Sequence, residues 1–207
     1  MKFNNEIHKI HEISNFKEMI NYTVEHYPDN IAYKFKKNFK KENESLVEKT
    51  YKEIKEEIEA FSTALLNMKL ENKKVAVIGS NRYEWCVTYL AATTGNMVIV
   101  PLDKALPTGE IENLIKISKA DAVVYENKFA EVFNKIKEEN TSNLTTYINM
   151  DLDNQKDGIL SFKELVEEGK ELIKNGNDSY NKIKMDNEKM SILLFTSGTT
   201  AMAKGVM

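Results

Sequence analysis

Short, uninterrupted apolar segments recur along the middle of the chain, and most are followed by a stretch with the apolar spacing of a helix. The apolar segments lie at 75–78, 98–100, 122–125, 145–148 and 191–195, and the helices are predicted at 82–94, 108–118 and 129–136. Strands that are apolar on both faces belong in a sheet that is covered on both faces, and parallel strands need crossover helices. The sequence therefore predicts an α/β fold, doubly wound, with a mainly parallel sheet, helices on both faces and right-handed crossovers.

Less regular elements flank this alternation. Ser14 precedes an amphipathic helix, and alternating residues over 31–35 predict a half-buried strand. Thr50 is expected to cap a long helix whose apolar residues form one stripe. Between 154 and 189 the chain is polar and rich in Asn, Lys and Glu, with one helix at 162–173, which predicts a surface excursion before the sheet resumes.

The composition is that of an ordinary globular protein. The formal net charge is −3 over 207 residues, so no overall positive field would attract nucleic acid. Cys86 is the single cysteine, which excludes an internal disulfide and fits a reducing compartment. The first residues carry no export signal, and no apolar run approaches the ~20 residues that span a bilayer. We expect a cytoplasmic protein without a transmembrane segment and leave contact with a membrane surface open.

The segment 196–205, after the last predicted strand, holds residue types that bind phosphate. A loop at the carboxyl end of a parallel strand lies where such sheets bind ligands, and glycine lets the backbone approach an anion closely. Hydroxyl groups can donate to phosphate oxygens, and a lysine supplies a compact positive charge. The candidate residues for binding a polyphosphate are Thr196, Ser197, Gly198, Thr199, Thr200, Lys204 and Gly205.

This pattern differs from a Walker A loop, in which the lysine follows glycine directly and precedes Ser or Thr. Here Ala203 precedes Lys204 and Gly205 follows it, which disfavours a P-loop kinase or GTPase. By composition alone, a flexible Ser/Thr/Gly tail explains the segment equally well. The residues themselves leave both interpretations open.

A second motif matches the calcium loop of an EF-hand in part. Positions 1, 3, 5, 6 and 12 of such a loop are filled by Asp153, Gln155, Asp157, Gly158 and Glu164. However, Gln replaces the usual Asp or Asn, a strand is predicted where the entering helix should be, and no second loop pairs with it. Turn residues before a helix capped by Ser161 explain the segment more simply. A non-catalytic nucleotide-fold or calcium-binding module is kept as the alternative function.

Other chemistry-bearing residues have no suitable neighbours in the sequence. His8, His11 and His26 lack carboxylate or cysteine partners at metal spacing, and Cys86 lacks a neighbouring base. No metal ligand and no nucleophilic triad is therefore predicted.

Three segments resemble the adenylate-forming superfamily, in that family's order. They are Thr-Tyr-Lys-Glu-Ile at 50–54, Asn-Arg-Tyr-Glu-Trp at 81–85 leading to 95–102, and Leu-Leu-Phe-Thr-Ser-Gly-Thr-Thr at 193–200 followed by Lys-Gly-Val at 204–206. The last segment resembles the phosphate loop of acyl-CoA synthetases, luciferases and peptide-synthetase adenylation domains. The Asn-x-x-Glu-Trp element at 81–85, the step into Val-Pro at 100–101 and Leu-Ser-Phe at 160–162 resemble the long-chain fatty acid CoA ligases more than the amino-acid-activating members.

The resemblance implies a two-step reaction. ATP and a carboxylic acid, here a fatty acid, give an acyl adenylate and pyrophosphate, and coenzyme A then takes the acyl group. By this resemblance, the β- and γ-phosphates of ATP would be bound by Thr196, Ser197, Gly198, Thr199, Thr200 and Lys204, and Gly205 would close the turn. The catalytic residues and the ligands of Mg²⁺ are expected beyond Met207. Residues 1–207 would be the N-terminal portion of the AMP-binding large domain, without the C-terminal lid domain, and we expect this portion alone to be inactive.

Two residues depart from the family's phosphate loop, because Ala201 stands where Gly is usual and Ala203 where Pro is usual. An alanine at 201 costs about 1 kcal/mol or more if the backbone there is left-handed. The rate of the reaction and the mobility of the loop therefore depend on the conformation at this position.

Overall fold

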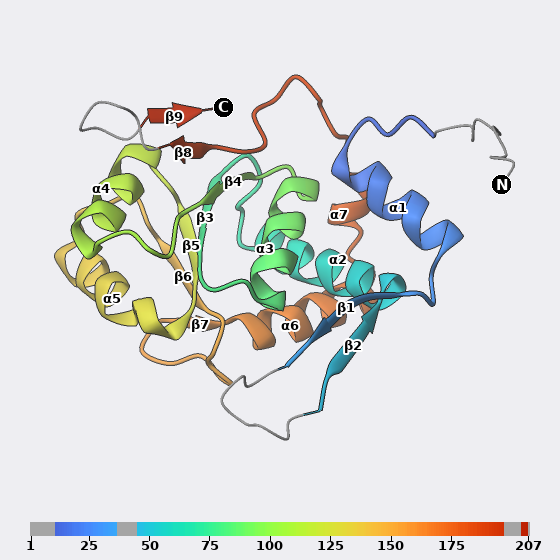
Figure 1. The fold of residues 1–207 in the computed structure, drawn as a ribbon, viewed down its shortest axis with the longest axis horizontal. Coiled ribbons are helices and arrows are strands. Elements are labelled where there is room, and N and C mark those ends of the chain that lie inside the picture. Colours follow the sequence, from blue (N-terminus) through green and yellow to red (C-terminus); the bar gives the residue numbers. More distant parts are fainter. Residues whose placement is uncertain (1–10, 37–44, 197–203, 207) are drawn as a thin grey trace, which may run out of the picture.

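Figure 1 shows the computed structural model, which describes residues 11–36, 45–196 and 204–206. The strands are β1 (Ile31–Phe35), β2 (Val47–Thr50), β3 (Lys74–Ile78), β4 (Val98–Pro101), β5 (Ala122–Tyr125), β6 (Thr146–Asn149), β7 (Leu160–Ser161), β8 (Leu194–Thr196) and β9 (Lys204–Val206). The helices are α1 (Phe16–His26), α2 (Tyr51–Asn67), α3 (Tyr83–Thr94), α4 (Thr108–Ser118), the 3₁₀ turn η1 (Asn127–Phe129), α5 (Ala130–Glu139), α6 (Phe162–Lys174) and α7 (Ser179–Lys182). None of the helices in these ranges is long and apolar enough to cross a bilayer.

Five strands form one sheet in the order β4-β3-β5-β6-β7, and every neighbouring pair is parallel. Val75 lies opposite Ile99 on one side and Ala122 on the other, so the middle of β3 is paired along both edges. The strands found here match the predicted segments 75–78, 98–100, 122–125 and 145–148 to within one residue at either end. The predicted parallel sheet is therefore confirmed.

The sheet separates two apolar cores. Val75 and Val77 of β3 face the core beneath α2, α3 and α6, whereas Ala76 and Ile78 face the core beneath α4 and α5. Successive side chains of a strand point to opposite faces, so a strand buried on both faces is apolar throughout. Helices on both faces confirm the doubly wound α/β fold.

The strand order also creates a topological switch point. From β3 the chain crosses to β4 on one side, and from β4 it returns past β3 to β5 on the other side. The loops after β3 and β5 therefore lead away in opposite directions from neighbouring strands. In open α/β sheets, the carboxyl edge at such a point is a common position for a ligand.

The segment 154–189 is not the surface excursion that its polar composition predicted. It contributes the edge strand β7 and the helix α6, in which Phe162, Leu165 and Val166 are buried. Gly169 lets α6 approach α2 closely, because a Cβ at this position would overlap the backbone of Ala60. The prediction was wrong because a narrow apolar stripe on a charged helix is hidden when composition is averaged over 36 residues.

The N-terminal part packs beside the main sheet, where α1 and the antiparallel pair β1–β2 lie near α2 and α3 (Figure 1). Helix α1 begins after Asn15, whose side chain accepts from the N–H of Glu18, and not after Ser14 as predicted. Thr50 caps α2 as predicted, and Glu53 completes a capping box. Strand β2, which ends at this cap, was not predicted.

Candidate functional site

The chain returns to the sheet beside β4 before it forms the predicted phosphate loop. The N–H of Ile99 donates to the carbonyl oxygen of Ser191, and the N–H of Leu193 donates to that of Ile99, both at 2.9 Å. This pairing is parallel, so the chain then emerges at the carboxyl edge of the sheet. The predicted strand 191–195 is thus found as a short paired segment followed by β8.

Strands β8 and β9 form an antiparallel hairpin that holds the ends of the predicted phosphate loop. Thr196 lies opposite Lys204, and Phe195 lies opposite Gly205. A Cβ at Gly205 would lie 3.2 Å from Cδ1 of Leu193, so this glycine allows a close approach. Among the candidate residues, Ser197, Gly198, Thr199 and Thr200 lie outside the described residues. The loop therefore begins and ends at the edge of the sheet where the sequence placed it.

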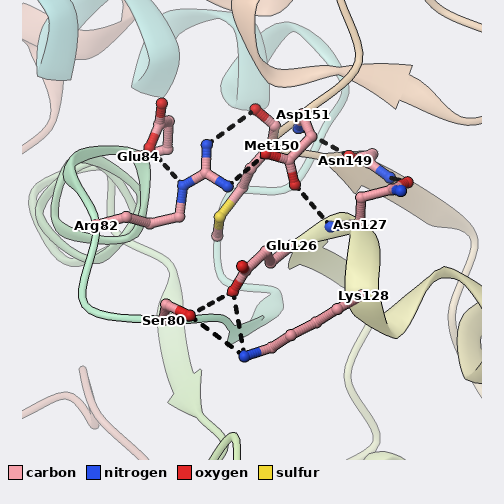
Figure 2. A network of polar contacts seen from close by, with 9 residues as sticks. All are labelled: Ser80, Arg82, Glu84, Glu126, Asn127, Lys128, Asn149, Met150 and Asp151. Carbon is pink, nitrogen blue, oxygen red and sulfur yellow. Dashed lines mark hydrogen bonds and ion pairs between the residues drawn. The ribbon is translucent and has the colours of Figure 1, made fainter. Parts of the chain in front are cut away.

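A network of charged side chains joins the loops after β3, β5 and β6 (Figure 2). Arg82 donates through Nε to Glu84 at 2.7 Å and through Nη1 to Asp151 at 2.6 Å. The other carboxylate oxygen of Asp151 accepts from the N–H of Asn127 at 2.7 Å. Partial burial alone would lower the pKa of Arg82, but the two carboxylates raise the pKa overall. We call these three loops, 79–82, 126–129 and 150–153, the carboxyl rim.

A second contact closes the rim at the switch point between β3 and β5. The carboxylate of Glu126 accepts from the N–H of Ser80 at 2.7 Å, and Nζ of Lys128 lies 3.4 Å from the same oxygen. Lys128 also donates to the hydroxyl of Ser80 at 3.2 Å. Burial alone would raise the pKa of Glu126, but the Ser80 N–H and Lys128 lower it overall. The carboxylate of Glu126 therefore already accepts from the hydrogen-bond donors at this position.

Replacing Glu126 with Gln is expected to lower the free energy of unfolding at pH 7 by about 1 kcal/mol, because a charge-assisted hydrogen bond is lost. The folded pKa of Glu126 lies below its ordinary value of about 4.3, so its contribution is present above that value. The difference between the two proteins should be constant from about pH 8 to pH 5 and vanish as the pH falls through the lowered pKa. Urea unfolding across this range measures it.

The exposed Glu138 of α5 offers a matched control, since Glu138→Gln makes the same chemical change away from the rim. A difference for Glu126→Gln that did not depend on pH, or that Glu138→Gln reproduced, would contradict the assigned contact.

Sequence reasoning did not select the carboxyl rim. Arg82 and Glu84 were named only as part of a family-like segment, and Glu126 and Asp151 were not named at all. One signal was available, because Ser80, Glu126 and Asp151 each follow a predicted strand by one to three residues. The carboxyl ends of parallel strands meet at one edge, so polar residues in these positions can be expected to lie together.

The geometry at 153–164 favours the turn interpretation over the calcium loop. The element before it is the strand β6, not an entering helix. Asp153 pairs with Lys163 at 2.8 Å, and the carboxylate of Glu164 accepts from the N–H of Gln155. Ser161 caps α6 as predicted. Within the ranges described above, no group of three or more His, Cys, Asp or Glu residues could hold a metal ion.

Two of the histidines, His11 and His26, lie beside Tyr22, and Cys86 lies within α3. His11 stacks on Tyr22 with ring centroids 4.2 Å apart, and a ring nitrogen of His26 lies 2.8 Å from the carbonyl oxygen of the same tyrosine. His8 lies outside the described residues. Cys86 is half-buried, and burial raises the pKa of its thiol, which does not favour a nucleophilic thiolate.

The fold and the edge hairpin together define a class of protein: a doubly wound α/β protein with a Thr-, Gly- and Lys-containing loop at the carboxyl edge of a parallel sheet. Comparison with protein families identifies one family within this class. The family described as AMP-binding enzyme matches residues 20–207, and the chain belongs to this family.

Several similar proteins are named as long-chain fatty acid ligases. The chain is 28% identical over 183 residues to long-chain-fatty-acid–CoA ligase 5 of Mus musculus, covering 82% of this chain and 26% of that protein. It is 27% identical over 174 residues to a chloroplastic long-chain-fatty-acid–[acyl-carrier-protein] ligase of Arabidopsis thaliana, covering 76% and 24%. A long-chain-fatty-acid-CoA ligase of Archaeoglobus fulgidus has the same fold, with a TM-score of 0.76 at 17% identity, over 96% of this chain and 37% of that structure. The chain thus spans about a quarter of the length of the two curated relatives.

Proposed function

We propose that this chain is the N-terminal part of an ATP-dependent acid–thiol ligase, and that its β8–β9 hairpin holds the phosphates of ATP. The observation that carries this proposal is the register that sets Thr196 opposite Lys204 at the carboxyl edge of the sheet. A hydroxyl, a lysine and glycine-flanked amides at the base of one loop suit a polyphosphate. The exposed position of Thr196 is compatible with contact to a ligand at this edge.

ATP would supply the adenylyl group that turns the carboxylate into a reactive acyl donor. The part of this chain would be to hold and neutralise the phosphates as negative charge develops on the leaving pyrophosphate. Thr196, Ser197, Thr199 and Thr200 would donate hydrogen bonds, and Lys204 would supply the charge. Catalytic residues and Mg²⁺ ligands belong, in this proposal, to sequence beyond Met207.

The acid is proposed to be a fatty acid, because several similar proteins are named long-chain fatty acid ligases. Coenzyme A is proposed as the acceptor thiol on the same basis. The Arabidopsis relative is named for an acyl-carrier protein instead, so a carrier-protein thiol is the alternative to test. A cytoplasmic location remains part of the proposal and rests on the single cysteine, which fits a reducing compartment.

Pyrophosphate exchange with ATP tests the proposed activity. A protein expressed from a reading frame extended downstream of residue 207 should exchange pyrophosphate in a fatty-acid-dependent manner. The 207-residue chain should show only background exchange, because it spans about a quarter of the similar ligases. Fatty-acid-dependent exchange by the 207-residue chain would contradict the second expectation, and an extended protein without exchange would contradict the first.

A further inference from the structure

The segment 81–85 resembles the family but has no part in the proposed phosphate site. Its side chains point to three different parts of the fold. Arg82 reaches the carboxyl rim, Tyr83 packs on the β1–β2 pair, and Trp85 stacks on Tyr89, which meets Phe16 of α1. The segment therefore lies where the rim meets the N-terminal part of the chain.

The guanidinium of Arg82 is held from two sides. Glu84 and Asp151 bind different nitrogens of its planar group, and Nη2 also lies 3.5 Å from the carbonyl oxygen of Met150 (Figure 2). Its side chain is only 20% exposed. A lysine presents a single ammonium and cannot reproduce this forked geometry. The shape of the group, and not its charge alone, joins the loop after β3 to the loop after β6.

The same arginine also secures the start of α3. Arg82 is the N-cap residue of this helix, but no side chain caps it by a hydrogen bond. Glu84, in the first turn, is instead fixed by Nε of Arg82. The exposed N–H groups at the start of a helix need such partners or water, so an unsupported first turn frays. Arg82 thus holds the first turn of α3 through Glu84.

Tyr83 connects the first turn of α3 to the β1–β2 pair by packing against β1. It is the first residue of α3 and is 6% exposed. Its ring stacks on Phe35 with centroids 4.8 Å apart and an interplanar angle of 7°, and it meets Tyr33 edge-on at 5.7 Å. Fraying of the first turn of α3 would therefore disturb the ring contacts that Tyr83 makes with Phe35 and Tyr33 of β1.

We propose that Arg82 is a latch that couples the carboxyl rim to the β1–β2 pair, so that releasing its guanidinium loosens both regions together. The connection is contiguous, from Asp151 through Arg82 and Glu84 to Tyr83 and Phe35. Regions that share such a connection open as one unit in native-state hydrogen exchange. The inference concerns the fold and is independent of the proposed ligase activity.

Amide hydrogen exchange on the 207-residue chain tests the latch. In Arg82→Ala, the amide of Asn127 and the amides of β1 and β2 should exchange at least tenfold faster, by more than any change in the buried strand β5. Arg82→Lys should behave similarly, because one ammonium nitrogen cannot occupy both the Nε position that contacts Glu84 and the Nη1 position that contacts Asp151. Asp151→Asn should accelerate the amide of Asn127 but leave β1 and β2 near their original rates, since the contact with Glu84 remains.

Lys135→Ala serves as the matched control, because it breaks a 2.8 Å ion pair with Glu112 on the other face of the sheet and should affect neither region. If Arg82→Ala accelerates amide exchange in the carboxyl rim but not in β1 and β2, the two regions are not coupled. Wild-type exchange rates in Arg82→Lys would show that a positive charge alone holds the two regions and that the forked shape of the guanidinium is not needed. Uniform acceleration, including β5, would reduce Arg82 to a general stabilising residue. If Arg82→Ala does not fold, Arg82→Lys carries the same comparison, and Asp151→Asn remains the variant that should affect the rim alone.

Discussion

Gly169→Ala is expected to lower the free energy of unfolding by about 3 kcal/mol, because the added methyl group would overlap backbone atoms of Ala60. A flexible side chain could move aside, but the carbonyl oxygen, carbonyl carbon and Cα of a buried helix cannot do so separately. The two helices α2 and α6 must move apart and lose contact around Phe61 and Phe162, whose ring centroids are 4.5 Å apart. Urea unfolding should report the loss, and the melting temperature should fall by about 6–12 °C.

Gly109→Ala provides the matched control within α4, because nothing lies within 4 Å of a Cβ built at that position. The same chemical change should be neutral there or stabilise by up to about 1 kcal/mol, since alanine restricts the unfolded chain and favours helix. Equal stability of Gly169→Ala and the wild type would contradict the close packing of α2 on α6.

The contact between Gly169 and Ala60 also shows which parts of the fold can be predicted from sequence patterns and which cannot. The central strands could be predicted because burial on both faces makes them apolar throughout, as at 75–78 and 122–125. Strand β7 has two residues and joins the sheet only through β6, so no periodicity marks it. Helix α6 was predicted, but its burial depends on a glycine that fits against one particular turn of α2. Such complementarity belongs to the packed structure and leaves no local pattern.

The same distinction applies to the candidate functional site at the carboxyl edge of the sheet. The candidate phosphate loop could be selected from the sequence because its residues are consecutive, and the structure adds the register of Thr196 with Lys204. By contrast, Arg82 and Asp151 are 69 residues apart, and Ser80 and Glu126 are 46 apart. Only the strand order brings these pairs together. Counting polar residues that directly follow predicted strands would have indicated their shared edge, although not their individual partners.

Lys204→Ala is expected to weaken the binding of pyrophosphate or ATP to the 207-residue chain by roughly 10- to 100-fold. A hydrogen bond to a charged group contributes about 1.5–3 kcal/mol, and each 1.4 kcal/mol corresponds to a factor of about ten in affinity. The effect should appear in calorimetric titrations and shrink at high salt, because dissolved ions screen the attraction between an ammonium group and a phosphate. The free energy of unfolding should change little, since β9 lies at the periphery of the fold beside β8 (Figure 1).

Lys184→Ala removes the same charge from an exposed position outside the hairpin and is the matched control. Because the net charge changes equally in both variants, a purely long-range attraction would weaken binding to the same extent in each. A loss confined to Lys204→Ala would instead require contact with the anion at the hairpin. Equal loss in both variants, or the same affinity in Lys204→Ala as in the wild type, would remove the hairpin from the phosphate site. A lack of measurable binding of pyrophosphate and ATP to the wild-type chain would contradict the proposal that this hairpin holds the phosphates.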